Sequence, residues 1–191
     1  MIQIGGLQKL SLIDYPGVPA AVIFTQGCNM RCPYCHNPQL VYPHLFETNM
    51  NNDEVFNFLK KRQKLLKGIV ITGGEPTLQK DLVKFIKKIK RLNFFVKLDT
   101  NGTNPKILKD LIDKNFLDFI AMDIKSSEDK YSLFFKGDLN MIKQSLNIIQ
   151  SSGIQHLFRT TYDKSILNEI DLSTIKKLVT TSTYIVQKCR K

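Results

Sequence analysis

The sequence predicts an α/β protein in which six parallel strands alternate with five helices. Short apolar runs recur along the chain, and longer segments with apolar residues at helical spacing lie between them. Glycine, proline and asparagine mark many of the boundaries. Alternation of this kind favours a parallel sheet with right-handed crossovers.

Residues 1–17 are predicted to form a short N-terminal extension. The stretch from Ile2 to Asp14 alternates loosely and ends in the turn Tyr15-Pro16-Gly17. We interpret it as a strand or hairpin that lies outside the main sheet. The first strand of that sheet is the continuous apolar run from Ala20 to Thr25, which is typical of a strand buried on both faces.

The rest of the chain alternates between predicted helices and strands, after a loop that lacks periodicity at residues 38–52. Asn51 or Asn52 suits a helix N-cap, Pro105 suits a first helical turn, and Gly153 suits a helix end. The further strands are predicted at Gly68–Thr72, Phe94–Leu98, Leu117–Met122, Gln155–Thr161 and Tyr184–Gln187. The helices are predicted at Asp53–Leu66, Gln79–Leu92, Pro105–Lys114, Leu139–Ser151 and Glu169–Val179.

The pattern alone leaves two architectures open. Six strands are too few for an eight-stranded barrel, so a doubly wound open sheet and a curved partial barrel both fit. The chain has 191 residues and contains no linker, repeat or low-complexity tract. We therefore expect one domain over residues 1–191.

Composition narrows the location and the class of partner. No apolar run is long enough to span a membrane, and the N-terminus lacks a secretory signal, so the sequence indicates a cytoplasmic protein. The net charge is +11, and its lysines cluster mainly at helical spacing. Solvated helix faces explain most of this charge. Because aromatic and basic residues are not interleaved, we rank an acidic protein partner above a nucleic acid.

Three cysteines in an eight-residue span follow the first predicted strand. Cys28, Cys32 and Cys35 have the spacing C-x3-C-x2-C. Three thiolates on a four-iron cluster would leave one iron open to a substrate or cofactor. The competing interpretation is a structural zinc site with His36 as fourth ligand. Adjacent residues seldom reach one tetrahedral metal together, so iron–sulfur is the preferred interpretation. Only Cys189 remains elsewhere; we expect it to be a bystander and expect no second cluster.

Polar residues and glycines follow the other predicted strands as well. Because the carboxyl ends of parallel strands meet at one edge, these motifs are expected to converge there. Singly, each has an ordinary explanation as a tight turn, a surface ion pair or a solvated residue. The motifs are Gly73-Gly74-Glu75-Pro76, Asp99-Thr100-Asn101-Gly102, Met122-Asp123-Ile124-Lys125 and Phe158-Arg159-Thr160-Thr161.

The cysteine spacing, with Tyr34 before the third cysteine and Gly-Gly-Glu-Pro after the second strand, resembles the radical S-adenosylmethionine (SAM) superfamily. The resemblance implies a partial (βα)6 TIM-like barrel. Cys35-His36-Asn37-Pro38, Leu98–Gly102 and Asp123-Ile124-Lys125 resemble the glycyl-radical-enzyme activating enzymes. The opening Leu10–Gly17 is similar to the subgroup that activates anaerobic ribonucleoside-triphosphate reductase.

The resemblance implies an oxidoreductase of the type that activates formate C-acetyltransferase. One 4Fe–4S cluster would sit on Cys28, Cys32 and Cys35, with SAM on the open iron. Reductive cleavage of SAM would then allow a hydrogen atom to be taken from a backbone glycine of a partner glycyl-radical enzyme. An acidic electron donor, such as flavodoxin or ferredoxin, would supply the electron.

The resemblance also assigns roles to individual residues. Those expected to bind SAM are Tyr34, Gly73, Gly74, Glu75, Asp99, Thr100, Asn101, Asp123, Lys125 and Arg159. Those expected to form a possible monovalent-cation site are Asp99, Thr100, Ala121 and Asp123. Two alternatives stay open: a radical SAM enzyme with a small-molecule substrate, such as 7-carboxy-7-deazaguanine synthase, and a structural zinc-binding module.

Overall fold

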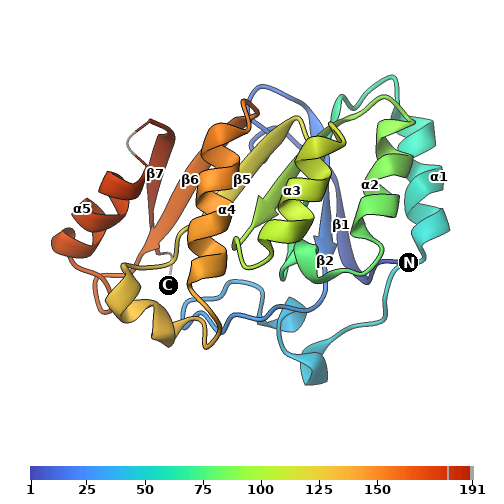
Figure 1. Ribbon diagram of the computed structural model, residues 1–191. Coiled ribbons are helices and arrows are strands. Elements are labelled where there is room, and N and C mark those ends of the chain that lie inside the picture. The colour runs from blue at the N-terminus through green and yellow to red at the C-terminus, as the bar shows by residue number, and fades with distance from the viewer. Residues whose placement is uncertain (180, 190–191) are drawn as a thin grey trace.

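The computed structural model describes residues 1–179 and 181–189, and within them one seven-stranded sheet forms the centre of the protein (Figure 1). The strands lie side by side in chain order. Strands β2 to β7 are parallel, whereas β1 is antiparallel to β2. Their bounds are β1 Ile4–Ser11, β2 Ala20–Thr25, β3 Gly68–Gly73, β4 Phe95–Thr100, β5 Phe119–Asp123, β6 Gln155–Tyr162 and β7 Thr183–Lys188.

Five helices cover one face of this sheet (Figure 1). They are α1 Asn52–Arg62, α2 Leu82–Lys90, α3 Pro105–Asp113, α4 Asn140–Ser151 and α5 Glu169–Leu178. Because β1 and β7 are the two unjoined edges, the sheet is open and not a closed barrel. A doubly wound sheet would have helices on both faces, so the strands in chain order with helices on one face confirm the predicted partial barrel with six parallel strands.

The core divides between the two faces of the sheet. Alternate strand residues such as Ile23, Ile71 and Ile120 pack in the main cluster with the helices. The residues between them, such as Val22 and Val70, join a much smaller cluster. The continuous apolar runs of the strands follow from this burial on both sides.

The prediction that the N-terminal strand lies outside the main sheet is wrong. Strand β1 pairs with β2, with Leu7 opposite Ile23. Without β1, strand β2 would be the edge of the sheet, and its backbone N–H and C=O groups on that side would lack hydrogen-bond partners. Strand β1 supplies these partners to β2, which is buried over most of its length. The loose alternation of β1 reflects its own exposure at the edge of the sheet.

Local sequence explains most helix boundaries. The Asn51 side chain accepts a hydrogen bond from the Asp53 backbone N–H and caps α1. Gly153, with φ +72°, follows the end of α4. Helix α2 begins at Leu82, three residues later than predicted, because Gln79 is used elsewhere. Its side chain donates to the Gln26 carbonyl and accepts from the Gln3 N–H.

This topology brings the carboxyl ends of β2 to β6 to one end of the sheet, at the lower side of Figure 1. The cysteine loop follows β2 directly, so all three clustered cysteines also lie at this end of the sheet. Within the described residues, no helix has the length and apolar character needed to cross a bilayer.

Candidate functional site

A cavity opens at the carboxyl ends of β2 to β6. It encloses about 500 Å³ of empty space, including the part open to solvent. Twelve of the residues that sequence reasoning singled out line it: Cys28, Cys32, Cys35, Gly73, Gly74, Glu75, Asp99, Thr100, Asn101, Asp123, Lys125 and Arg159. Three side chains in the wall were not predicted: Met30, Val41 and Thr72. The expected convergence of the strand-end motifs is therefore present.

The cysteine loop is held by contacts with its own backbone and with the loop after β4. The Cys35 N–H donates to the Cys32 carbonyl at 3.1 Å. The Asn101 amide donates to the Asn29 side chain at 3.0 Å and lies 3.9 Å from the Cys28 sulfur. Burial raises the pKa of the Cys28 thiol to about 11. Three half-buried thiols that line one cavity suit a cluster ligand set, since metal binding displaces their protons and leaves thiolates.

The glycine pair after β3 permits a close backbone approach to the cysteine loop. A Cβ on Gly74 would lie 2.1 Å from the Gly27 carbonyl oxygen, and one on Gly73 would lie 2.3 Å from the Thr25 nitrogen. Two hydrogen bonds join these segments, from the Gly74 N–H to the Thr25 carbonyl and from the Glu75 N–H to the Gly27 carbonyl. Gly73 also has φ +115°, which disfavours any side chain.

Replacing Gly74 by alanine is expected to lower the free energy of unfolding by about 1–3 kcal/mol, because the new methyl group overlaps backbone that cannot move freely. Urea unfolding of the cluster-free protein measures this change. Gly6→Ala is the matched control, since its Cβ would meet nothing closer than 3.7 Å. If Gly6→Ala and Gly74→Ala lowered the free energy of unfolding equally, the close backbone approach at Gly74 would not be the cause of the loss.

Glu75 is buried, and both of its carboxylate oxygens are used within the protein. Oε1 accepts hydrogen bonds from the Thr77 hydroxyl and N–H and from the Thr100 hydroxyl, at 2.5 to 3.0 Å. Oε2 accepts from the Asn101 N–H at 2.6 Å. Burial raises the pKa of Glu75, and these hydrogen bonds oppose the rise. Glu75 therefore joins the turn after β3 to the turn after β4.

An ion-pair cluster lies at the ends of β4, β5 and β6. Asp123 accepts from Arg159 Nε at 2.6 Å and from Lys125 Nζ at 2.9 Å. Asp99 pairs with the buried Lys97 and lies 3.7 Å from Arg159. Burial alone would raise the pKa of Asp123, but Lys125 and Arg159 bring it below the usual carboxyl range. Burial would likewise lower the pKa of Lys125, but Asp123 keeps it above its ordinary value.

This pairing predicts a specific dependence of stability on pH. A carboxyl whose pKa is lower in the folded state stabilises fully above its unfolded pKa of about 4, and the contribution falls as pH decreases further. The difference in unfolding free energy between wild type and Asp123→Asn should be constant from about pH 8 to about pH 5 and shrink below about pH 4. Urea titrations at several pH values measure it. A difference that grows toward acid would contradict the pairing.

Two of the predicted site residues, Ala121 and Tyr34, are not among those that line the cavity. Ala121 is buried in β5, in register with Asp99. Tyr34 packs on Phe134, with ring centroids 5.7 Å apart, and its buried hydroxyl has no hydrogen-bond partner in the described part of the chain. Both carboxylates of the predicted monovalent-cation site are already paired with cationic side chains. That site stays a prediction.

The zinc alternative receives no geometric support. Among residues 1–179 and 181–189, no three His, Cys, Asp or Glu side chains are arranged to hold a single metal ion. His36 is exposed at the surface. The three cysteines line one cavity together with the strand-end motifs, and the cluster interpretation rests on that arrangement.

The segment after β5, which sequence analysis did not single out, forms hydrogen bonds with the backbone of Arg31 and of Lys125. The short 3₁₀ helix Glu128–Leu133 follows β5. Its Tyr131 hydroxyl accepts from the Lys125 N–H at 3.3 Å, and the Phe134 carbonyl accepts from the Arg31 N–H at 2.9 Å. Both aromatic residues are buried. Their presence in a loop was the only available signal, and it does not specify which segment they contact.

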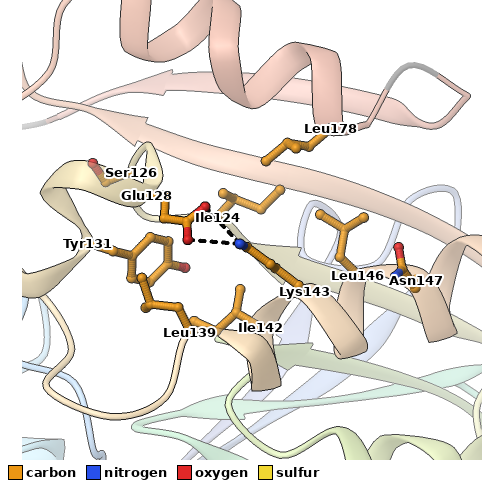
Figure 2. Close-up of a pocket in the computed structure, with 10 residues that line it drawn as sticks. All are labelled: Ile124, Ser126, Glu128, Tyr131, Leu139, Ile142, Lys143, Leu146, Asn147 and Leu178. Atoms are coloured by element: carbon orange, nitrogen blue, oxygen red, sulfur yellow. Dashed lines mark hydrogen bonds and ion pairs between the residues drawn. The ribbon is translucent and has the colours of Figure 1, made fainter.

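A second pocket lies beside this segment, with Ile124 and Ser126 in its wall (Figure 2). These residues flank Lys125, which lines the main cavity instead. The wall of the second pocket is largely apolar, but it also includes Glu128 and Lys143, which form an ion pair 2.8 Å long. None of the clustered cysteines contributes to it, so it is separate from the main cavity.

Comparison with known proteins agrees with this geometry. The family model described as the radical SAM superfamily matches residues 22–171. A protein of Methanocaldococcus jannaschii named as a glycyl-radical enzyme activating enzyme is 38% identical over 183 residues, which are 92% of this chain and 75% of that protein. A second protein of that organism with the same description is 32% identical over 163 residues, 82% of this chain and 60% of that protein.

Among solved structures, SuiB of Streptococcus suis bound to S-adenosylmethionine has a similar fold. The TM-score is 0.70 at 14% identity, and the match covers 89% of this chain and 40% of that chain. At this level of identity the similarity concerns the fold alone. The chain thus spans three quarters or less of each of these three proteins.

Proposed function

The chain belongs to the radical SAM superfamily, and on that premise we propose that it activates a glycyl-radical enzyme. Its cofactors are a 4Fe–4S cluster on three cysteines and SAM. The observation that carries the proposal is a cavity that holds Cys28, Cys32 and Cys35 together with the strand-end motifs. Two relatives of the chain that are named as such activating enzymes support it.

In this proposal the three cysteines hold the cluster, and the strand ends hold SAM. The chemistry supplied there is a one-electron cleavage of SAM that allows a hydrogen atom to be taken from a glycine Cα. The backbone at Gly73 and Gly74 lines the cavity without side chains, so its carbonyls are suitable acceptors for an ammonium group. Because Glu75 is satisfied within the protein, it serves mainly to fix Thr100 and Asn101 in the wall.

The charge of the ion-pair cluster suits the carboxylate of SAM. The cluster has two acidic groups, Asp99 and Asp123, and three basic ones, Lys97, Lys125 and Arg159. The excess of one positive charge favours an anion, and an arginine presents several N–H donors to it. Asp123 holds Lys125 and Arg159 in fixed positions, so little ordering is required when the carboxylate binds.

The partner that we propose is anaerobic ribonucleoside-triphosphate reductase, with an acidic flavodoxin or ferredoxin as electron donor. The segment Leu10–Gly17, which is similar to that subgroup, supports the choice of reductase. The net charge of +11 supports an acidic donor.

The test mixes the anaerobically reconstituted protein with SAM, a reductant and a purified glycyl-radical enzyme, and records the electron paramagnetic resonance (EPR) spectrum. We expect a glycyl radical signal on the reductase and none when Cys32→Ala replaces the wild type. A signal on a different glycyl-radical enzyme alone would show that the named partner is wrong. Cleavage of SAM without a signal on any of them would favour a small-molecule substrate, such as that of 7-carboxy-7-deazaguanine synthase.

A further inference from the structure

Exposed apolar side chains gather at the end of the sheet opposite the cavity. Leu12 and Ile13 follow β1 and are 69% and 88% exposed. Leu65, just before β3, is 64% exposed, and Phe95, at the start of β4, is 52% exposed. Because β1 runs antiparallel to β2, its carboxyl end lies beside the amino ends of the parallel strands, at the top of Figure 1. We call these four residues the amino-end surface.

The turns that carry this surface are joined by hydrogen bonds. The Lys67 N–H donates to the Pro19 carbonyl, and the Phe95 N–H donates to the Lys67 carbonyl, both at 2.9 Å. The Gln63 side chain donates to the Leu92 carbonyl at 3.0 Å. These hydrogen bonds join the turns after β1, α1 and α2 to one another at this end of the sheet.

The positive charge of the protein is concentrated next to this surface. Residues 60–67 and 84–91 contain ten basic and no acidic residues, whereas the rest of the chain has 18 basic and 17 acidic ones. The first stretch is the carboxyl end of α1 with the turn after it, and the second covers most of α2, including its carboxyl end. The two helices pack through Phe56 and Phe85. Two of the ten, Lys84 and Lys90, pair with Asp81 and Asp118, so eight basic side chains without a carboxylate partner in the described residues remain in this region.

We propose that the amino-end surface docks an acidic protein whose own interface has an apolar centre. Exposed apolar residues beside a basic area match the usual anatomy of a protein interface and complement negative charge. A second copy of this chain would bring like charges together. Three of the four apolar residues are aliphatic, so base stacking does not explain them.

Docking at this surface leaves the cavity accessible. Strand β3 has six residues, so about 20 Å separates the two ends of the sheet. A partner bound here can hold the enzyme while another molecule occupies the cavity. The proposal rests on the exposed residues and their charge, and it stands whether or not the partner of the cavity is a glycyl-radical enzyme.

Fluorescence anisotropy with the full chain tests the proposal. The probe is a labelled peptide of repeated Glu-Glu-Leu units at low ionic strength, and a Glu-Glu-Gly peptide of the same charge is the comparison. Lys64→Glu combined with Lys67→Glu should weaken binding of the leucine peptide at least about tenfold. Lys176→Glu with Lys177→Glu, at exposed positions on α5, makes the same charge change and should weaken it less than about twofold.

The apolar part of the surface is tested by Leu65→Ser combined with Phe95→Ser. This variant should bind the leucine peptide at least about fivefold more weakly and bind the glycine peptide unchanged. Equal weakening by the α5 control, equal binding of the two peptides, or no binding would overturn the proposal. Tighter binding to phosphatidylglycerol vesicles or to a single-stranded oligonucleotide than to the leucine peptide would also overturn it. Unchanged unfolding temperatures confirm that the variants are folded.

Discussion

The Cys32→Ala variant is expected to lose the cluster and all cleavage of SAM. Cys32 is the middle member of three thiols that line one cavity, and no fourth cysteine lies in the loop. With two thiolates left, a four-iron cluster has too few protein ligands to persist. We expect the iron content to fall from about four atoms per chain to below about one, and SAM cleavage to fall to background.

The matched control is Cys189→Ala, which removes a half-buried thiol from the far end of the chain. It should keep about four irons and full cleavage. If Cys32→Ala retained the cluster and activity, or if Cys189→Ala lost them, the ligand assignment would be wrong. Iron analysis and quantification of the 5′-deoxyadenosine product after anaerobic reconstitution provide both readouts.

Replacing Asp123 by alanine is expected to weaken SAM binding while the cluster remains. Asp123 orients Lys125 and Arg159, and neither has another carboxylate within 3.5 Å in the described residues. Without it, both cations lose their fixed positions, and we expect the dissociation constant to rise about 10- to 100-fold. Leaving Lys125 without a carboxylate partner, and Arg159 with only its longer contact to Asp99, should also lower the free energy of unfolding by about 1–3 kcal/mol.

Asp118→Ala is a suitable control for this variant. Asp118 pairs with Lys90 at 2.6 Å, is similarly exposed, and lies at the opposite end of the sheet. We expect it to affect stability and leave SAM binding unchanged. Iron content and equilibrium binding of SAM are measured on the same reconstituted samples. Loss of the cluster in Asp123→Ala with normal SAM binding after reconstitution would contradict the role that we assign to Asp123.

Much of the fold could be predicted because the strands are apolar and the strand ends are not. The run Ala20–Thr25 is buried over most of its length, so its bounds are visible in the sequence, and they match β2. The convergence at the cavity followed from topology alone, because parallel strands align their carboxyl ends. Asp123 and Arg159 are 36 residues apart in the sequence and 2.6 Å apart in the structure for this reason.

The features that were missed depend on contacts between distant segments. The pairing of β1 with β2 is set by the needs of an edge strand, which no local pattern in residues 4–11 reveals. The contact between Phe134 and the cysteine loop joins residues about a hundred positions apart. The hydrogen-bond donors to Glu75 come from the turn after β3 and from the turn after β4. Because these turns are far apart in the sequence, sequence analysis indicated a carboxylate at the site but not that its oxygens are already hydrogen-bonded within the protein.

The most direct test of a cluster on Cys28, Cys32 and Cys35 is the metal content and EPR spectrum of the wild-type protein, purified without oxygen. We predict brown protein with about four irons per chain, whose reduced spectrum changes when SAM is added, since SAM binds at the open iron. Colourless protein with one zinc and no iron, or a four-iron spectrum that SAM does not alter, would contradict this assignment.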